Sequence, residues 1–206
     1  MTSATVDDPN VHLEDPDLIG RRWRTGVRLL IFADASFVAA LLFSYLYLRG
    51  LNTENAWLRP GQATAPIGVS WLIAAGVVLS AVAFRWALRS IEAGAESRFV
   101  AGALLALGVL VIDIVGQVLQ LMNFPFGVED SAYSSAMYTL AGANLVHLLL
   151  TAFLGVAMWN RGRLHIYSAT SFWQVRLVSL WWSWVSLAAV LSAFTTSFIA
   201  GPHTGG

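Results

Sequence analysis

Residues 27–49 read VRLLIFADASFVAALLFSYLYLR, and this stretch decides the fold class. A helix rises about 1.5 Å per residue, so about 20 mostly apolar residues can cross the hydrocarbon core of a bilayer. The stretch has that length, and it lacks the alternation with a period of two that marks the strands of a membrane barrel. We therefore predict a transmembrane helix here.

Further stretches of the same kind follow along the chain, separated by short linkers rich in polar and turn-forming residues. The sequence thus predicts an all-α integral membrane bundle of five transmembrane helices in one domain, over about 26–200. An acidic-to-basic tail is expected at 1–25 and a short tail at 201–206. The spans are expected at about 27–49, 66–88, 99–121, 135–159 and 175–199.

The composition agrees with a membrane protein. Hydrophobic residues make up 57% of the chain and charged residues 12%, whereas globular domains carry roughly 25% charged residues. Basic and acidic residues balance at 12 each, and no basic run is interleaved with aromatic residues, so no nucleic-acid partner is expected. Cysteine is absent, which excludes disulfides, Cys-ligated zinc and iron–sulfur clusters held by this chain.

The arginines indicate an orientation. Most of them fall in 21–28, 85–98 and 161–176, which lie on one side of the membrane if the five spans alternate in direction. The positive-inside rule makes that side cytoplasmic. We therefore expect the N-terminus in the cytoplasm and the C-terminus outside.

Polar side chains inside the expected spans require an explanation, because burying a polar group in the membrane costs free energy. For Asp34, two interpretations stay open. In the first, Asp34 is a functional carboxylate, either proton-linked or linked to a lipid headgroup. In the second, it is a buried acid that is hydrogen-bonded to a neighbouring helix. The candidates are Asp34, Asp113, Gln117, Gln120, Asn144 and His147.

Helical spacing groups the other candidates. Asp113, Gln117 and Gln120 are four and three residues apart and therefore share one helical face. The sequence favours an interhelical hydrogen-bond network over a proton-linked site for this stripe. Asn144 and His147 also share a face, and a structural hydrogen-bonded pair is favoured over a ligand or a proton relay.

The tryptophans of the last span, Trp181, Trp182 and Trp184, lie deeper than an interfacial belt, so we expect them to pack against neighbouring helices or lipid. Only His147 lies within a span, too few for a haem held by two span histidines, and a dinuclear copper site needs cysteines. No nucleophile–base set, zinc helix or phosphate loop is visible. We therefore expect this chain to bind no metal or redox cofactor and to have no active site of its own.

Several segments resemble one membrane family. Residues 26–37, GVRLLIFADASF, resemble the opening span of subunit III of the haem–copper oxidases, with Asp34 where that family has glutamate. Residues 133–147, YSSAMYTLAGANLVH, are similar to the family's Tyr-Gly-Ser…Gly-Phe-His-Gly-Leu-His signature. Gly142 and His147 match that signature, whereas Asn144 replaces its first histidine.

The last span extends the resemblance. Residues 180–186, LWWSWVS, look like the family's Trp-Tyr-Trp-His-Phe-Val-Asp, with Trp182 and Val185 as matches. Gln117 and Gln120 lie where the family has glutamine followed by an acidic residue. The resemblance implies the five-helix bacterial form of subunit III, located in the cytoplasmic membrane.

The resemblance also implies a function. Subunit III is a non-catalytic accessory subunit that packs on the catalytic subunit I among other respiratory subunits, binds phospholipids, and supports proton uptake and stability. Haem and copper are then expected in partner subunits, and bound phospholipid on this chain.

Other functions stay open at this point. A related subunit accompanies nitric-oxide reductases. An independent small proton-linked transporter using Asp34, Asp113 and His147 is a second alternative, although no internal repeat is evident and no proline lies deep in a span. An independent membrane enzyme is a third.

Overall fold

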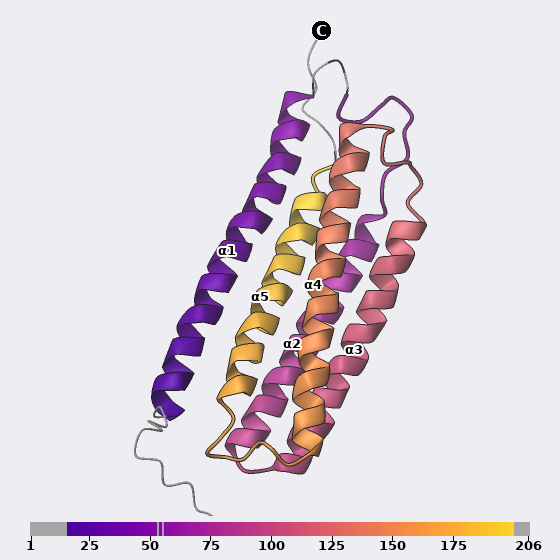
Figure 1. Ribbon diagram of the computed structural model, residues 1–206. Helices are drawn as coiled ribbons and strands as arrows, with labels where there is room; N and C mark the ends of the chain where they lie inside the picture. The colour runs from indigo at the N-terminus through magenta and orange to yellow at the C-terminus, as the bar shows by residue number, and fades with distance from the viewer. Residues whose placement is uncertain (1–15, 53, 55, 200–206) are drawn as a thin grey trace, which may run out of the picture.

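The computed structural model describes residues 16–52, 54 and 56–199, and it is an antiparallel bundle of long helices (Figure 1). Five helices in the described part are long and apolar enough to cross a membrane, which confirms the predicted all-α, five-helix membrane bundle. The elements are α1 Pro16–Leu51, α2 Ile67–Glu92, α3 Glu96–Met122, α4 Ala132–Arg163 and α5 Trp173–Thr196.

The helix ends differ from the expected span ends. α1 already begins at Pro16, within the segment expected as a tail, and α4 extends at both ends from Ala132 to Arg163. Hydropathy detects only the apolar part of a helix, whereas backbone hydrogen bonding continues into the headgroup region. α5 stops at Thr196, before the expected end of its span. The rest of the N-terminal tail, 1–15, and the C-terminal tail at 201–206 lie outside the described residues.

Local chemistry sets several of these ends. Pro66 precedes the first turn of α2, and the Ser131 side chain caps α4 by accepting a hydrogen bond from the Ser134 backbone N–H at 3.2 Å. Gly94 has φ +74° between α2 and α3, a conformation that glycine adopts without steric cost. The chain can therefore reverse there within a few residues.

Helices α2, α3, α4 and α5 form a closed ring, because each contacts the next and α5 returns to α2. α1 stands at the side of this ring (Figure 1) and contacts α4 and α5 but neither α2 nor α3. The ring encloses the larger hydrophobic core. At its centre Trp182 stacks on Phe84 with centroids 4.4 Å apart and donates its indole N–H to Ser80 at 2.9 Å.

Small residues let these helices approach closely, as in many membrane bundles. A β-carbon at Gly155 of α4 would lie 2.8 Å from Leu107 and 3.0 Å from Trp182, and one at Gly102 of α3 would lie 2.8 Å from Trp86. Glycine at these two positions is therefore a packing requirement.

A second, smaller core closes the end of the bundle where α1 ends and α4 begins. Trp57, in the connection between α1 and α2, is buried against Tyr45 and Tyr133 and donates its indole N–H to the Ile199 carbonyl at 2.8 Å. The Tyr133 hydroxyl accepts a hydrogen bond from the Ala65 backbone N–H at 3.0 Å. These bonds tie the connection and the end of α5 to α4.

Candidate functional site

A hydrogen-bonded site joins α1 to the ring. His147 of α4 places Nε2 2.9 Å and 3.0 Å from the two carboxylate oxygens of Asp34 on α1. Trp184 of α5 donates its indole N–H to Oδ2 of the same carboxylate at 2.6 Å. One side chain of α1 thus bonds to both helices that α1 contacts.

The site is largely shielded. The side chains of His147 and Asp34 are 9% and 17% exposed. Behind the histidine, the Thr151 hydroxyl donates to the His147 carbonyl at 2.7 Å, and Trp181 donates its indole N–H to that hydroxyl at 3.0 Å. A second hydrogen-bonded path from α5 therefore supports the helix turn that carries His147.

Chemically, the His147–Asp34 contact holds one proton between a nitrogen and a carboxylate, whichever group carries it. Trp184 can only donate, so it always takes an acceptor position on Asp34. The arrangement can serve as a tether between helices and as a place where a proton resides. The sequence left both interpretations of Asp34 open, and the contacts supply the neighbouring-helix partners that the second interpretation requires.

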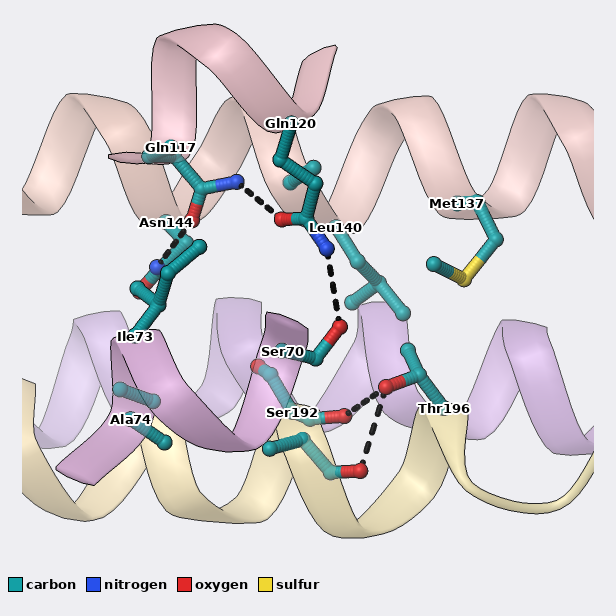
Figure 2. A pocket seen from close by; sticks show the side chains of 13 residues that line it. Ser70, Ile73, Ala74, Gln117, Gln120, Met137, Leu140, Asn144, Ser192 and Thr196 are labelled. Carbon is teal, nitrogen blue, oxygen red and sulfur yellow. Dashed lines mark hydrogen bonds between the residues drawn. The ribbon is translucent and has the colours of Figure 1, made fainter. Parts of the chain in front are cut away.

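A second polar network crosses the ring (Figure 2). Asn144 of α4 donates to Gln117 at 2.6 Å, Gln117 donates to Gln120 at 2.8 Å, and Gln120 donates to Ser70 of α2 at 3.0 Å. The network therefore links α4 to α3 and α3 to α2. It borders a cavity of about 30 Å³, which exceeds the roughly 10–15 Å³ that one water needs.

Asp113 does not share these bonds. Its side chain lies on α3 against α2, where the carboxyl occupies the space that a β-carbon of Gly76 would need. Asp113 is 7% exposed, and its Oδ2 has no hydrogen-bond partner among the described residues. Of the stripe expected on α3, the two glutamines join one network and the aspartate packs separately.

Asn144 and His147, expected to share a face, do not bond to each other in the structure. Asn144 reaches Gln117 on α3, whereas His147 reaches Asp34 on α1. Sequence reasoning missed Trp184 as a partner of Asp34. The available signal was an indole N–H at membrane depth, which needs an acceptor as any buried donor does.

An apolar groove lies between α1, α4 and α5 and has a volume of about 440 Å³. Arg161 and Gln174 stand at one end of it and are hydrogen-bonded to each other at 2.9 Å. Its size falls within the range of small-ligand sites. The other lining residues are Trp23, Val27, Leu30, Leu150, Leu154, Met158, Trp173, Leu177, Val178 and Trp181.

Metal-ligating side chains do not cluster in the described part of the chain. No group of three or more histidine, aspartate or glutamate side chains gathers there in a geometry that could hold an ion. Two histidine–carboxylate pairs occur among the described residues, Asp34–His147 and Glu96–His165, and in each pair the facing atoms already bond to each other.

Comparison with known proteins identifies the family. The family model of cytochrome c oxidase subunit III matches residues 11–195. Cytochrome c oxidase subunit 3 of Kluyveromyces lactis is 23% identical over 68% of this chain and 54% of its own length, and that of Saccharomyces cerevisiae is 22% identical over the same shares. Cytochrome c oxidase subunit 3 of Anopheles gambiae is 22% identical over 84% of this chain and 66% of its own length.

The matched segment thus spans about half the length of each yeast relative. The family match itself covers nearly all of the described helices, from within the N-terminal tail almost to the end of α5. The resemblance seen in the segments around Asp34, His147 and Trp182 is therefore confirmed, and the chain belongs to the cytochrome c oxidase subunit III family.

Proposed function

We propose that this chain is a non-catalytic accessory subunit of a haem–copper terminal oxidase that packs on the catalytic subunit. One observation carries the proposal beyond the family match. The three segments with the family resemblance, 26–37, 133–147 and 180–186, each contribute one side chain to a single hydrogen-bonded site.

The hydrogen bonds of Asp34 to His147 and Trp184, which we call the tether, suggest a first role for the site. By holding α1 against α4 and α5, it helps to define one wall of the apolar groove. We propose that this groove takes an acyl chain of a phospholipid, because its lining is almost entirely apolar and Arg161 lies at one end, where its guanidinium could bind the headgroup. Loss of the tether would then weaken both the packing of α1 and the binding of the phospholipid.

The contact between Asp34 and His147 suggests the second role. We propose that this hydrogen-bonded pair of ionisable groups supports proton uptake by the complex and the durability of its catalytic subunit. Haem and copper are proposed to belong to partner subunits. The arginine distribution supports an orientation with the start of α1 on the cytoplasmic side. The five-helix form supports a bacterial cytoplasmic membrane as the location.

The test is a purification of the tagged full chain in mild detergent, with an untagged strain as control. The expected result is a reduced-minus-oxidised spectrum with haem bands and a co-purifying histidine-rich catalytic subunit identified by mass spectrometry. Oxygen consumption by the complex identifies an oxidase, whereas reduction of nitric oxide would assign it to a nitric-oxide reductase instead. A colourless chain that purifies without partners contradicts the accessory role and favours the transporter alternative.

A further inference from the structure

The small cavity beside the polar network of the ring is bounded by α2, α3, α4 and α5 together (Figure 2). It has a volume of about 30 Å³. Its lining includes Gln120, Thr196 and Ser70, which stand near the end of α3, the end of α5 and the start of α2. Short side chains from three of the helices also line it: Ala74, Ala141, Ala189 and Ala193. The cavity thus lies close to one end of the bundle, where alanines leave a space between the helices.

The direct side-chain bonds at this cavity leave α5 out. The bonds that run from Asn144 through the two glutamines to Ser70 join α4, α3 and α2. α5 lines the same cavity with Ser192 and Thr196. The Thr196 hydroxyl donates within its own helix, to the carbonyls of Ser192 and Ala193 at 2.9 Å and 3.2 Å. The Ser192 hydroxyl has no hydrogen-bond partner among the described residues.

Other lining residues keep unused hydrogen-bonding groups. Asn144 donates to Gln117 and keeps its side-chain oxygen as an acceptor, while Gln117 keeps a second amide N–H. The Ser70 hydroxyl accepts from Gln120 and can still donate, as can the Ser192 hydroxyl. Lipid cannot satisfy these groups, and an unpaired polar group inside a membrane bundle costs free energy. The lining therefore favours a small ligand that both donates and accepts hydrogen bonds.

We propose that this cavity binds ordered water, which links α5 to the other three helices of the ring. One water needs roughly 10–15 Å³ of such a volume and makes about three hydrogen bonds to buried polar groups. The cavity meets both conditions, because it is larger than this and each of the four helices offers it a polar side chain. Water would thus complete a ring of hydrogen bonds that the direct contacts leave open at α5. Hydration of the ring is independent of the accessory role proposed above.

The experiment is pulsed X-ray radiolysis of the full chain in lipid nanodiscs, with mass spectrometry of methionine oxidation. The pulse makes hydroxyl radicals from water, so a buried methionine is oxidised rapidly only where bound water touches it. Met137 lines the cavity and is 3% exposed, whereas Met158 lines the apolar groove and is 6% exposed. We expect rapid oxidation of Met137 and slow oxidation of Met158, although both are shielded from bulk water.

A pair of variants locates the water. Ala74→Val adds two carbons at the cavity wall and should displace the water, so oxidation of Met137 should fall to the rate of Met158. Ala75→Val is the matched control. It makes the same change one residue further along α2, at an exposed position outside the cavity lining, and should leave oxidation of Met137 unchanged.

Two results would overturn the proposal. Equally slow oxidation of Met137 and Met158 in the wild type would show that the cavity is dry. Equal oxidation of Met137 in the two alanine variants would place the water elsewhere. The wild-type comparison needs no variant, so it decides the question even if Ala74→Val fails to fold. It also needs no oxidase partner, so a chain that purifies alone contradicts the accessory role without affecting this test.

Discussion

The indole N–H of Trp184 donates to Oδ2 of Asp34 at 2.6 Å, across 150 positions of sequence. His147 approaches the same carboxylate from a different helix at 2.9 Å. Asp34 is therefore the point at which α1, α4 and α5 are joined, and its two partners can be removed separately.

Trp184→Phe should remove the indole donor and keep most of the ring volume. Hydrogen bonds between membrane helices contribute about 0.6 kcal/mol on average and up to about 1.7 kcal/mol, so we expect a loss of stability of this order. Thermal unfolding in detergent measures it. Trp71→Phe is the control, because Trp71 donates to Ser197 at an exposed position. Equal shifts for the two variants would contradict a special role for the Trp184 bond.

Asp34→Ala should leave the complex assembled but shorten its active lifetime, because α1 loses its bonds to both neighbours. The measurement is turnover of the purified complex over repeated cycles, together with its phospholipid content. Asp34→Asn should behave more mildly, since its amide oxygen can still accept from Trp184. Unchanged lifetime and unchanged lipid content in Asp34→Ala would refute the proposed role.

Gly76→Ala should destabilise the α2–α3 contact, because the new methyl group would occupy the position of the Asp113 carboxyl. Overpacking of this kind costs about 1–3 kcal/mol, readable as a lower unfolding temperature. Gly68→Ala on the same helix meets nothing within 4 Å and should be neutral or slightly stabilising. Adding Asp113→Ala to Gly76→Ala should restore stability. Failure of that rescue would show that the close approach is not what forbids a side chain here.

Gln117→Leu should cost more stability than Ser70→Ala. Gln117 lies in the middle of its network, so its loss leaves the Asn144 amide N–H and the Gln120 side-chain oxygen without their partners, whereas Ser70 ends the chain of bonds. A buried polar group without a partner costs about 1–3 kcal/mol. Denaturant titration in detergent compares the two variants. A Ser70→Ala loss equal to that of Gln117→Leu would contradict the central place of Gln117 in the network.

The sequence predicted the bundle well because membrane-spanning helices can be recognised by their length and hydropathy. It placed Asp113, Gln117 and Gln120 on one face, and all three are indeed buried against protein. It could not say which helix each side chain meets, since that depends on the order of helices around the ring and on their relative height. Hence the bond between Asn144 and Gln117 was not foreseen.

Prediction of the Asp34 site from the sequence had the same limit. Its acid and its histidine could be singled out because each is costly in a membrane. The indole N–H of Trp184 indicated the need for an acceptor but not which helix supplies it. The spacing of residues within one span does not determine their position along the bundle axis relative to residues on another span.

The contacts of α1 have a consequence for biogenesis. α1 leaves the ribosome before every other helix described here, yet the two helices it contacts, α4 and α5, are synthesised last. Until they arrive, α1 must wait in the bilayer or at the insertion machinery with the Asp34 carboxyl unmatched by its native donors. The last of these helices to be inserted, α5, is thus also the one that completes the packing contacts of α1.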